Sequence, residues 1–206
     1  MAAGPVGTDL GAAAATIRAG GVVAYPTDTV VGLGCDARNP AAVARVLAIK
    51  GRDDEKGLPV LIAAVEDAAS LADVTPDLRR LAEKCWPGAL TIVAAARPGL
   101  PRGLMAADST VGLRVPDLAL TRRLIERFGG PIVGTSANRS GEPPVRNAHA
   151  IDPTLAREID YILDGDAGGK MPSTVITLAA QPPRLLRSGA VGLPALRQII
   201  PELTDR

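Results

Sequence analysis

The sequence is poor in aromatic side chains: its 206 residues include one Trp, two Tyr and one Phe. Proteins that read single-stranded RNA stack its bases on exposed aromatic rings, and this chain has few rings for such a surface. The charges nearly cancel as well, with 23 Lys and Arg against 22 Asp and Glu. A strong, sequence-independent attraction to nucleic acid is therefore not expected of the whole chain, and any cationic site must be local.

Cysteine, histidine and long apolar runs are also scarce. Cys35 and Cys85 lie far apart in no Cys-x-x-Cys or Cys/His spacing, which argues against a disulfide framework or a structural zinc site and favours a cytoplasmic protein. The single histidine, His149, has no nucleophile motif around it, so we expect it on the surface. No segment approaches the roughly 20 apolar residues of a membrane span, and the N-terminal stretch does not resemble a signal peptide. We expect no membrane association.

Helical and strand patterns alternate along the chain. With 47% hydrophobic residues the chain can bury a core, and its 18 prolines and 22 glycines are spread out, without a linker. Apolar spacing and capping residues predict helices at 10–17, 41–50, 76–85, 118–128 and 193–200. Strands are predicted at 22–25, 58–63, 90–95, 111–115, 131–134, 160–163, 174–178 and 184–186. The prediction is one α/β domain over residues 1–206, in which helices flank a mixed β-sheet.

Two hydroxyls, a carboxylate and two glycines follow the first predicted strand, in the stretch Tyr25 to Gly34. Ligand sites gather at strand ends of this kind, and glycines allow a ligand to approach the backbone closely. Thr27, Asp28 and Thr29 are the candidate contacts. A tight turn capped by Asp28 or Thr29 explains the same residues, and this pattern alone leaves both interpretations open.

A charged segment lies between a predicted helix and strand, at residues 50–59. Its cations, Lys50, Arg52 and Lys56, could hold a polyphosphate through charge-assisted hydrogen bonds. A solvated loop without a ligand is the alternative. In both cases we expect Lys50 and Arg52 on an exposed loop.

Residues 110–115 alternate along a predicted strand. The period of two places Thr110, Gly112 and Arg114 on one face of the sheet. An arginine on a core strand usually pairs with a carboxylate, which can belong to the protein or to a ligand. The sequence does not decide between them.

Small polar side chains are dense after the strand 131–134, where residues 135–141 read Thr-Ser-Ala-Asn-Arg-Ser-Gly. Four hydroxyl or amide side chains within six residues exceed the needs of a turn and favour a cradle for phosphate or ribose. Further along, Ser173 opens a strand, and Arg187 closes the next one. Each adds one polar group to the inventory.

In their order along the chain, these motifs resemble one known family. The match is colinear from about residue 20 to 191. The chain resembles the YrdC-like threonylcarbamoyl-AMP synthases. The motifs that carry the resemblance are Pro26-Thr27-Asp28-Thr29 with Gly32-Leu33-Gly34, Lys50-x-Arg52, Trp86-Pro87-Gly88, Arg114-x-Pro116, Ser136-Ala137-Asn138-x-Ser140-Gly141, Ser173-Thr174 and Arg187-x-Gly189. The resemblance implies the short, single-domain form, with a twisted mixed sheet flanked by helices around a concave, cationic cavity.

The resemblance also implies a reaction and a set of site residues. ATP, L-threonine and bicarbonate would give threonylcarbamoyl-AMP and pyrophosphate, a nucleotidyltransferase step that begins a tRNA modification. Position by position, it implies that Lys50 and Arg52 hold the triphosphate as the catalytic pair, that Ser136, Asn138, Ser140 and Arg187 contact ATP, and that Thr27, Arg114 and Ser173 surround threonine. Lys56, Thr110 and Thr135 are weaker candidates for the same cavity.

No protein nucleophile and no protein metal ligand are implied, because the threonine carbamate attacks the α-phosphate directly and Mg²⁺ is held through the ATP phosphates. The implied partners are downstream proteins that transfer the threonylcarbamoyl group to tRNA. The tRNA itself, or double-stranded RNA, is a further candidate partner.

One position departs from the family pattern: residue 31 is Val, where Tyr is usual. We expect the loss of an aromatic wall of the cavity there, with an effect on threonine affinity or selectivity. This departure leaves open a related enzyme that activates another amine. A second alternative, of a different class, is a non-catalytic module of the same fold that binds double-stranded RNA.

Overall fold

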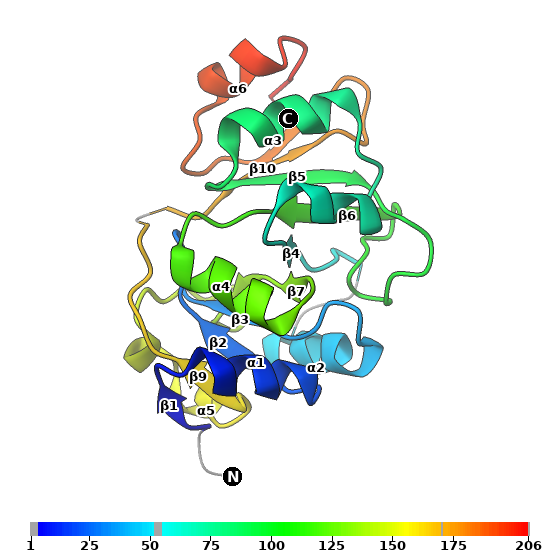
Figure 1. The fold of residues 1–206 in the computed structure, drawn as a ribbon. Helices are drawn as coiled ribbons and strands as arrows, with labels where there is room; N and C mark the ends of the chain where they lie inside the picture. The colour runs from blue at the N-terminus through cyan, green and yellow to red at the C-terminus, as the bar shows by residue number, and fades with distance from the viewer. Residues whose placement is uncertain (1–3, 52–54, 170, 206) are drawn as a thin grey trace.

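The strands of this protein are divided between two sheets (Figure 1). The computed structural model describes residues 4–51, 55–169 and 171–205. Within these residues, the five-stranded sheet has the order β1-β9-β2-β3-β8 and the six-stranded sheet the order β11-β10-β5-β6-β4-β7. The strands are β1 (Val6–Gly7), β2 (Val23–Tyr25), β3 (Gly32–Gly34), β4 (Val60–Leu61), β5 (Leu90–Ala95), β6 (Thr110–Arg114), β7 (Ile132–Val133), β8 (Thr135–Ser136), β9 (Tyr161–Leu163), β10 (Thr174–Thr177) and β11 (Arg184–Arg187). Both sheets mix parallel and antiparallel pairs.

Helices cover the outer surfaces of these sheets. They are α1 (Leu10–Arg18), α2 (Pro40–Lys50), α3 (Pro76–Cys85), α4 (Ala119–Phe128), α5 (Pro153–Ala156) and α6 (Leu193–Ile199), with 3₁₀ turns η1 (Val65–Ser70) and η2 (Ala148–Ala150). Figure 1 shows α3 and α6 together at the end of the molecule formed by the six-stranded sheet, and α1 packs against α4 and β9 at the other. The predicted α/β class is confirmed, and the predicted mixed sheet is realised as two.

Local sequence signals account for where the helices begin and end. The side chain of Asn39 accepts hydrogen bonds from the N–H groups of Ala41 and Ala42, and Pro40 occupies the first turn of α2. Gly51 ends this helix in the left-handed conformation at φ 56°. Lys50 is therefore the last residue of α2, directly before the glycine that ends the helix.

The chain crosses from one sheet to the other at Gly134. Strand β7 pairs with β4 of the six-stranded sheet, whereas β8 pairs with β3 of the five-stranded sheet. Between them the Gly134 N–H donates to the Pro59 carbonyl at 2.8 Å. A Cβ atom on Gly134 would lie 2.4 Å from Cγ of Leu61, so no larger side chain fits without displacement. The crossover places Thr135 and Ser136 on an edge strand next to the other sheet.

Candidate active site

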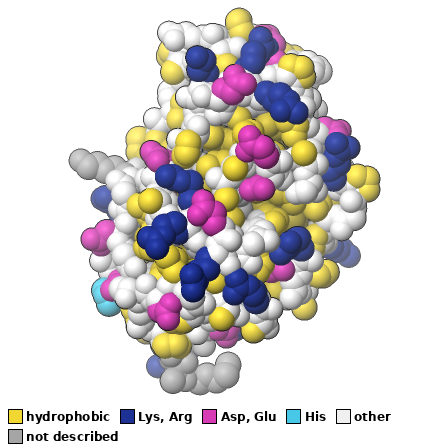
Figure 2. All heavy atoms as spheres, viewed as in Figure 1, with side chains coloured by type: hydrophobic (Ala, Val, Ile, Leu, Met, Phe, Trp, Pro, Cys, Tyr) yellow, Lys and Arg dark blue, Asp and Glu magenta, His cyan; other side chains and the backbone are white. Residues whose placement is uncertain are grey.

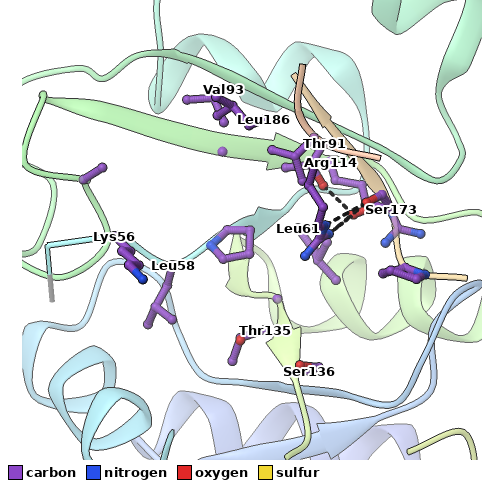
Figure 3. Close-up of a pocket in the computed structure, with 18 of the residues that line it drawn as sticks. Lys56, Leu58, Leu61, Thr91, Val93, Arg114, Thr135, Ser136, Ser173 and Leu186 are labelled. Atoms are coloured by element: carbon purple, nitrogen blue, oxygen red, sulfur yellow. Dashed lines mark hydrogen bonds between the residues drawn. The ribbon is translucent and has the colours of Figure 1, made fainter. Parts of the chain in front are cut away.

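A cavity of about 1020 Å³ is lined by residues of both sheets and by the end of α2. Figure 3 shows Lys56 and Leu58 on one side of it, Thr91, Arg114 and Ser173 on another, and Thr135 with Ser136 on strand β8. Twelve site residues were predicted, and Arg52 lies outside the described residues. The other eleven all line this cavity, namely Thr27, Lys50, Lys56, Thr110, Arg114, Thr135, Ser136, Asn138, Ser140, Ser173 and Arg187.

Basic side chains outnumber acidic ones in the described lining. The basic residues are Lys50, Lys56, Arg114, Arg184 and Arg187, and the acidic ones are Asp108 and Glu142. On the face of the molecule that Figure 2 shows, basic and acidic side chains are interspersed. This distribution agrees with a nearly neutral chain whose excess of cations is local.

Lys50 is not on an exposed loop, and the prediction that it would be is wrong. It is the last residue of α2, and 3% of it is exposed. Its Nζ donates to the Ser136 carbonyl at 2.6 Å and to the Asn138 carbonyl. In return, the Ser140 N–H donates to the Lys50 carbonyl at 3.0 Å. The helix end and the loop 136–140 therefore hold each other in place, since α2 leaves its last carbonyls without partners inside the helix.

The amide nitrogen of Asn138 has hydrogen-bond partners, whereas its amide oxygen has none among the described residues. Its Nδ2 donates to the carbonyls of Arg139 and Glu142, both at 2.8 Å. Its Oδ1 is buried and has no hydrogen-bond partner. Two carbonyl acceptors fix the amide orientation, because a flipped amide would place Oδ1 against them. A buried carbonyl oxygen without a partner costs about 1–3 kcal/mol, so Oδ1 is an acceptor that a ligand donor would satisfy.

On the other side of the cavity, a connected group joins the loop after β2 to strand β6. The hydroxyl of Thr27 lies 3.0 Å from that of Thr29 and accepts from the Val30 N–H at 3.2 Å. Arg114 donates from Nη1 to Thr29 at 3.1 Å and from Nη2 to the carboxylate of Asp28. Its Nε donates to the Gly88 carbonyl at 2.8 Å, which the turn after Trp86-Pro87 presents. The carboxylate partner of Arg114 therefore belongs to the protein.

Ser173, directly before β10, contacts Arg187, the last residue of β11. Arg187 donates from Nη2 to the Ser173 hydroxyl at 3.0 Å and to its carbonyl at 2.8 Å. The same hydroxyl lies 2.9 Å from that of Thr91 (Figure 3). A cation and two hydroxyls thus form one hydrogen-bonded cluster on the six-stranded sheet.

The predicted alternation on β6 is confirmed: Thr110, Gly112 and Arg114 all face the cavity. The Thr110 hydroxyl donates to the Asp108 carboxylate at 2.7 Å. Gly112 leaves space in the cavity beside Thr91. A Cβ atom on Gly112 would lie 3.2 Å from Cγ2 of Thr91. His149 is exposed, as predicted, with 68% of its side chain accessible.

Val31 does not form part of the cavity wall. It is 1% exposed and packs in the main hydrophobic core. Its N–H donates to the Val145 carbonyl and its carbonyl accepts from the Ala137 N–H, both at 2.9 Å. The neighbouring Val30 lines the cavity instead. The expected loss of an aromatic wall at position 31 is therefore not what this structure shows.

Sequence reasoning missed several residues around the cavity. Asp28 was noticed in its motif but not paired with Arg114, while Thr91, Asp108 and Arg184 were not considered. A usable signal existed for Thr91, because the alternation of the predicted strand 90–95 places Thr91 and Val93 on one face. No local pattern marks Arg184 or Asp108.

The described part of the chain has neither a metal-binding cluster nor a membrane-spanning helix. No group of three or more His, Cys, Asp and Glu side chains there could hold a metal ion. None of its helices is both long and apolar enough to cross a membrane. The two thiols are free, and burial raises the pKa of Cys35 to about 12 and also raises that of Cys85.

Comparison with known proteins identifies the family. The Sua5/yciO/yrdC family model, described as Telomere recombination, matches residues 15–189. The chain belongs to this family. A threonylcarbamoyl-AMP synthase from Stenotrophomonas maltophilia is 44% identical over 173 residues, which cover 81% of this chain and 91% of that relative.

Solved structures agree with the Sua5/yciO/yrdC assignment. The H234A/Y235A variant of P. abyssi Sua5 has a TM-score of 0.89 and 35% identity, and the match covers 100% of this chain and 62% of that one. P. abyssi Sua5 complexed with L-threonine has a TM-score of 0.88 and 37% identity, over 96% of this chain and 58% of that one. This chain thus spans less than two thirds of the P. abyssi protein.

Proposed function

We propose that this protein is a threonylcarbamoyl-AMP synthase, which forms threonylcarbamoyl-AMP and pyrophosphate from L-threonine, bicarbonate and ATP for tRNA modification. A relative with 44% identity carries that name, and a solved structure of the same fold was determined with L-threonine. The observation that carries the proposal is the 3.0 Å hydrogen bond between Ser173 and Arg187. It joins a residue assigned to threonine with one assigned to ATP, and the reaction requires these substrates to touch.

The chemistry is a condensation without a protein nucleophile. The threonine amine adds to carbon dioxide derived from bicarbonate and loses a proton, which gives a carbamate. A carbamate oxygen then attacks the α-phosphorus of ATP, the bond from this phosphorus to the bridging oxygen breaks, and pyrophosphate leaves with the electron pair. The protein must align the carbamate with the phosphate and offset the charge that develops on the leaving group.

The end of α2 and the loop 136–140 serve the nucleotide in this proposal. Lys50 and Arg52 hold the triphosphate, and the ammonium of Lys50 acts from a buried position, where charge is screened less than in water. Ser136, Asn138 and Ser140 contact the nucleotide. Both N–H groups of the Asn138 amide donate to carbonyls, so its remaining capacity is that of an acceptor at Oδ1. Arg187 approaches the nucleotide from β11.

Threonine lies on the opposite side, between Thr27, Arg114 and Ser173. The guanidinium of Arg114 is oriented by Asp28, Thr29 and the Gly88 carbonyl before any ligand arrives. A preoriented cation of this kind can receive a carboxylate without losing side-chain entropy on binding. Lys56, Thr110 and Thr135 complete the cavity.

The described residues offer no metal cage of their own, so we assign Mg²⁺ to the phosphate oxygens and water. Held there, it would offset negative charge on the departing pyrophosphate. The product requires downstream proteins that transfer the threonylcarbamoyl group to tRNA. Both cysteines are free thiols, which supports a cytoplasmic location.

The test is pyrophosphate release by the purified protein from ATP and bicarbonate, with and without L-threonine, and with L-serine as the control amino acid. We expect threonine-dependent release, and threonylcarbamoyl-AMP as the product by mass spectrometry. Arg187→Ala should lose release, whereas Arg197→Ala, which alters a cation that donates to the Leu203 carbonyl outside the cavity, should keep it.

No release with any amino acid from folded protein would overturn the proposal and favour a double-stranded RNA-binding module. Such binding would weaken steeply as salt concentration rises, since it depends on contacts to phosphates. Release that depends on an amine other than threonine would instead identify a related enzyme with another substrate.

A further inference from the structure

We infer that Arg139 is a positioning residue for the nucleotide side of the cavity, a role that rests on the function proposed above. Arg139 lies between Asn138 and Ser140 in the chain, yet its own side chain is not among the residues that line the cavity. It acts on the site through the atoms that it holds.

Arg139 joins three parts of the fold, namely its own loop, the end of α2 and the segment before β9. Its Nη1 donates to the Ile49 carbonyl at 3.1 Å, and its Nη2 donates to the Glu158 carboxylate at 2.8 Å. Its backbone N–H donates to the Glu142 carboxylate at 3.1 Å. One residue thereby ties the loop to the end of α2 and to the segment that precedes β9.

These contacts set the register of the loop against the helix. Arg139 bonds to the carbonyl of Ile49, and the next loop residue, Ser140, bonds to the carbonyl of the next helix residue, Lys50. Two consecutive loop residues therefore match two consecutive helix carbonyls that have no partner within α2. A shift of the loop by one residue would break both bonds together.

The same contacts fix the Arg139 carbonyl, to which the Asn138 amide donates. The carbonyl of Arg139 accepts from Asn138 Nδ2, and this arrangement leaves Asn138 Oδ1 buried without a partner. The Arg139 contacts keep the Asn138 amide in this orientation, so the nucleotide meets a loop whose acceptor at Oδ1 is already in place.

The chain offers a matched control in Arg45. Its ion pair with Asp160 has side-chain exposures of 40% and 38%, against 40% and 41% for Arg139 and Glu158. Arg45 also donates to the Glu158 carbonyl at 2.8 Å, and it belongs to the same helix, α2. It makes no described contact with residues 136–142, so its loss tests stability of this region without release of the loop.

The experiment compares Arg139→Ala, Arg139→Lys and Arg45→Ala with the unaltered protein. Hydrogen exchange of the amides of residues 137–140 reports on the loop, calorimetry gives the Kd for ATP, and pyrophosphate release gives KM for ATP and for threonine. For Arg139→Ala we expect faster exchange and about a tenfold rise in Kd and KM for ATP, the equivalent of one charge-assisted hydrogen bond. The KM for threonine should not change. Arg139→Lys should restore part of the affinity, and Arg45→Ala should leave exchange and ATP affinity unaltered.

Unchanged exchange in Arg139→Ala would overturn the inference, and so would faster exchange without any loss of ATP affinity. Equal effects on the KM values of both substrates would also overturn it, because they indicate a general structural defect. If the unaltered protein releases no pyrophosphate, the proposed function fails by itself, and exchange together with the Kd for ATP still decides the role of Arg139.

Discussion

Arg114 and Asp28 form an ion pair that is almost removed from water, with side-chain exposures of 7% and 13%. Removal of one partner of such a pair leaves an uncompensated buried charge. We expect Asp28→Ala to lower the free energy of unfolding by about 3–5 kcal/mol in urea denaturation. Asp28→Asn should cost less, because its amide oxygen still accepts from the guanidinium. A loss below about 1 kcal/mol in Asp28→Ala would place this pair among ordinary surface ion pairs.

Lys50 combines a structural and a proposed catalytic role, and its substitution should reveal both. Lys50→Met keeps the aliphatic length but leaves the carbonyls of Ser136 and Asn138 without their donor, at about 1–3 kcal/mol each. Turnover should fall by about 10²-fold or more, because a cation near the phosphates is lost. Lys84→Met, at an exposed position on α3, is the matched control for the loss of a lysine. An active, fully stable Lys50→Met protein would contradict both assignments.

Val30 and Val31 are neighbours on opposite sides of the backbone, and tyrosine at each position should have a different effect. Val31→Tyr should overpack the core and lower the free energy of unfolding by about 1–3 kcal/mol, with little change in KM for threonine. In Val30→Tyr the new ring should enter the cavity and raise the KM for threonine, with a smaller loss of stability than in Val31→Tyr. Denaturation curves and KM values measured side by side distinguish the two. A lower KM for threonine in Val31→Tyr would restore the aromatic-wall interpretation.

Cys35 should make stability depend on pH in the alkaline range. Burial raises the pKa of its thiol from 9.0 to about 12 in the folded protein. The denatured chain loses this proton from about pH 9 upward, whereas the folded chain keeps it. The contribution of Cys35 to stability is therefore complete below pH 9 and is lost as pH rises towards 12.

Chemical denaturation at pH 8, 9, 10 and 11 measures this dependence. Cys35→Ala should show a shallower decline with pH than the unaltered protein, whatever its absolute stability. Some slope should persist, because burial also raises the pKa of Tyr25, which accordingly opposes ionisation in the folded state. Identical slopes in the two proteins would refute the assignment to Cys35.

The elements that sequence reasoning located carry strong local signals. Helix α3 and strand β5 have the predicted bounds, since Thr75 and Pro76 mark the start of the helix and six apolar or β-branched residues form the strand. Strands β3 and β8 were missed because they contain two or three glycine or hydroxyl residues, too few for an alternating pattern. The division into two sheets was missed because the chain passes between them after β3, β7 and β9, and no local sequence pattern marks these passages.

The candidate site was predicted as a set of residues, without its internal contacts. Motif order was sufficient to bring Thr27, Ser173 and Arg187 into one list, and the cavity contains all three. The burial of Lys50 could not be read from its charged neighbours, because it depends on carbonyls that belong to a distant loop. The same is true of the choice of Asp28 as the partner of Arg114, since either a protein or a ligand carboxylate satisfies an arginine equally well.

The bond from Lys50 to Ser136 and the bond from Arg114 to Asp28 each span 86 residues of chain. Contacts this remote in sequence form only after large loops have closed, which is slow and entropically costly. A chain interrupted before residue 136 therefore has neither the loop that orders Lys50 nor a place for ATP. Substrate binding should consequently report completed folding of the chain, and saturating substrate should stabilise the folded protein by mass action.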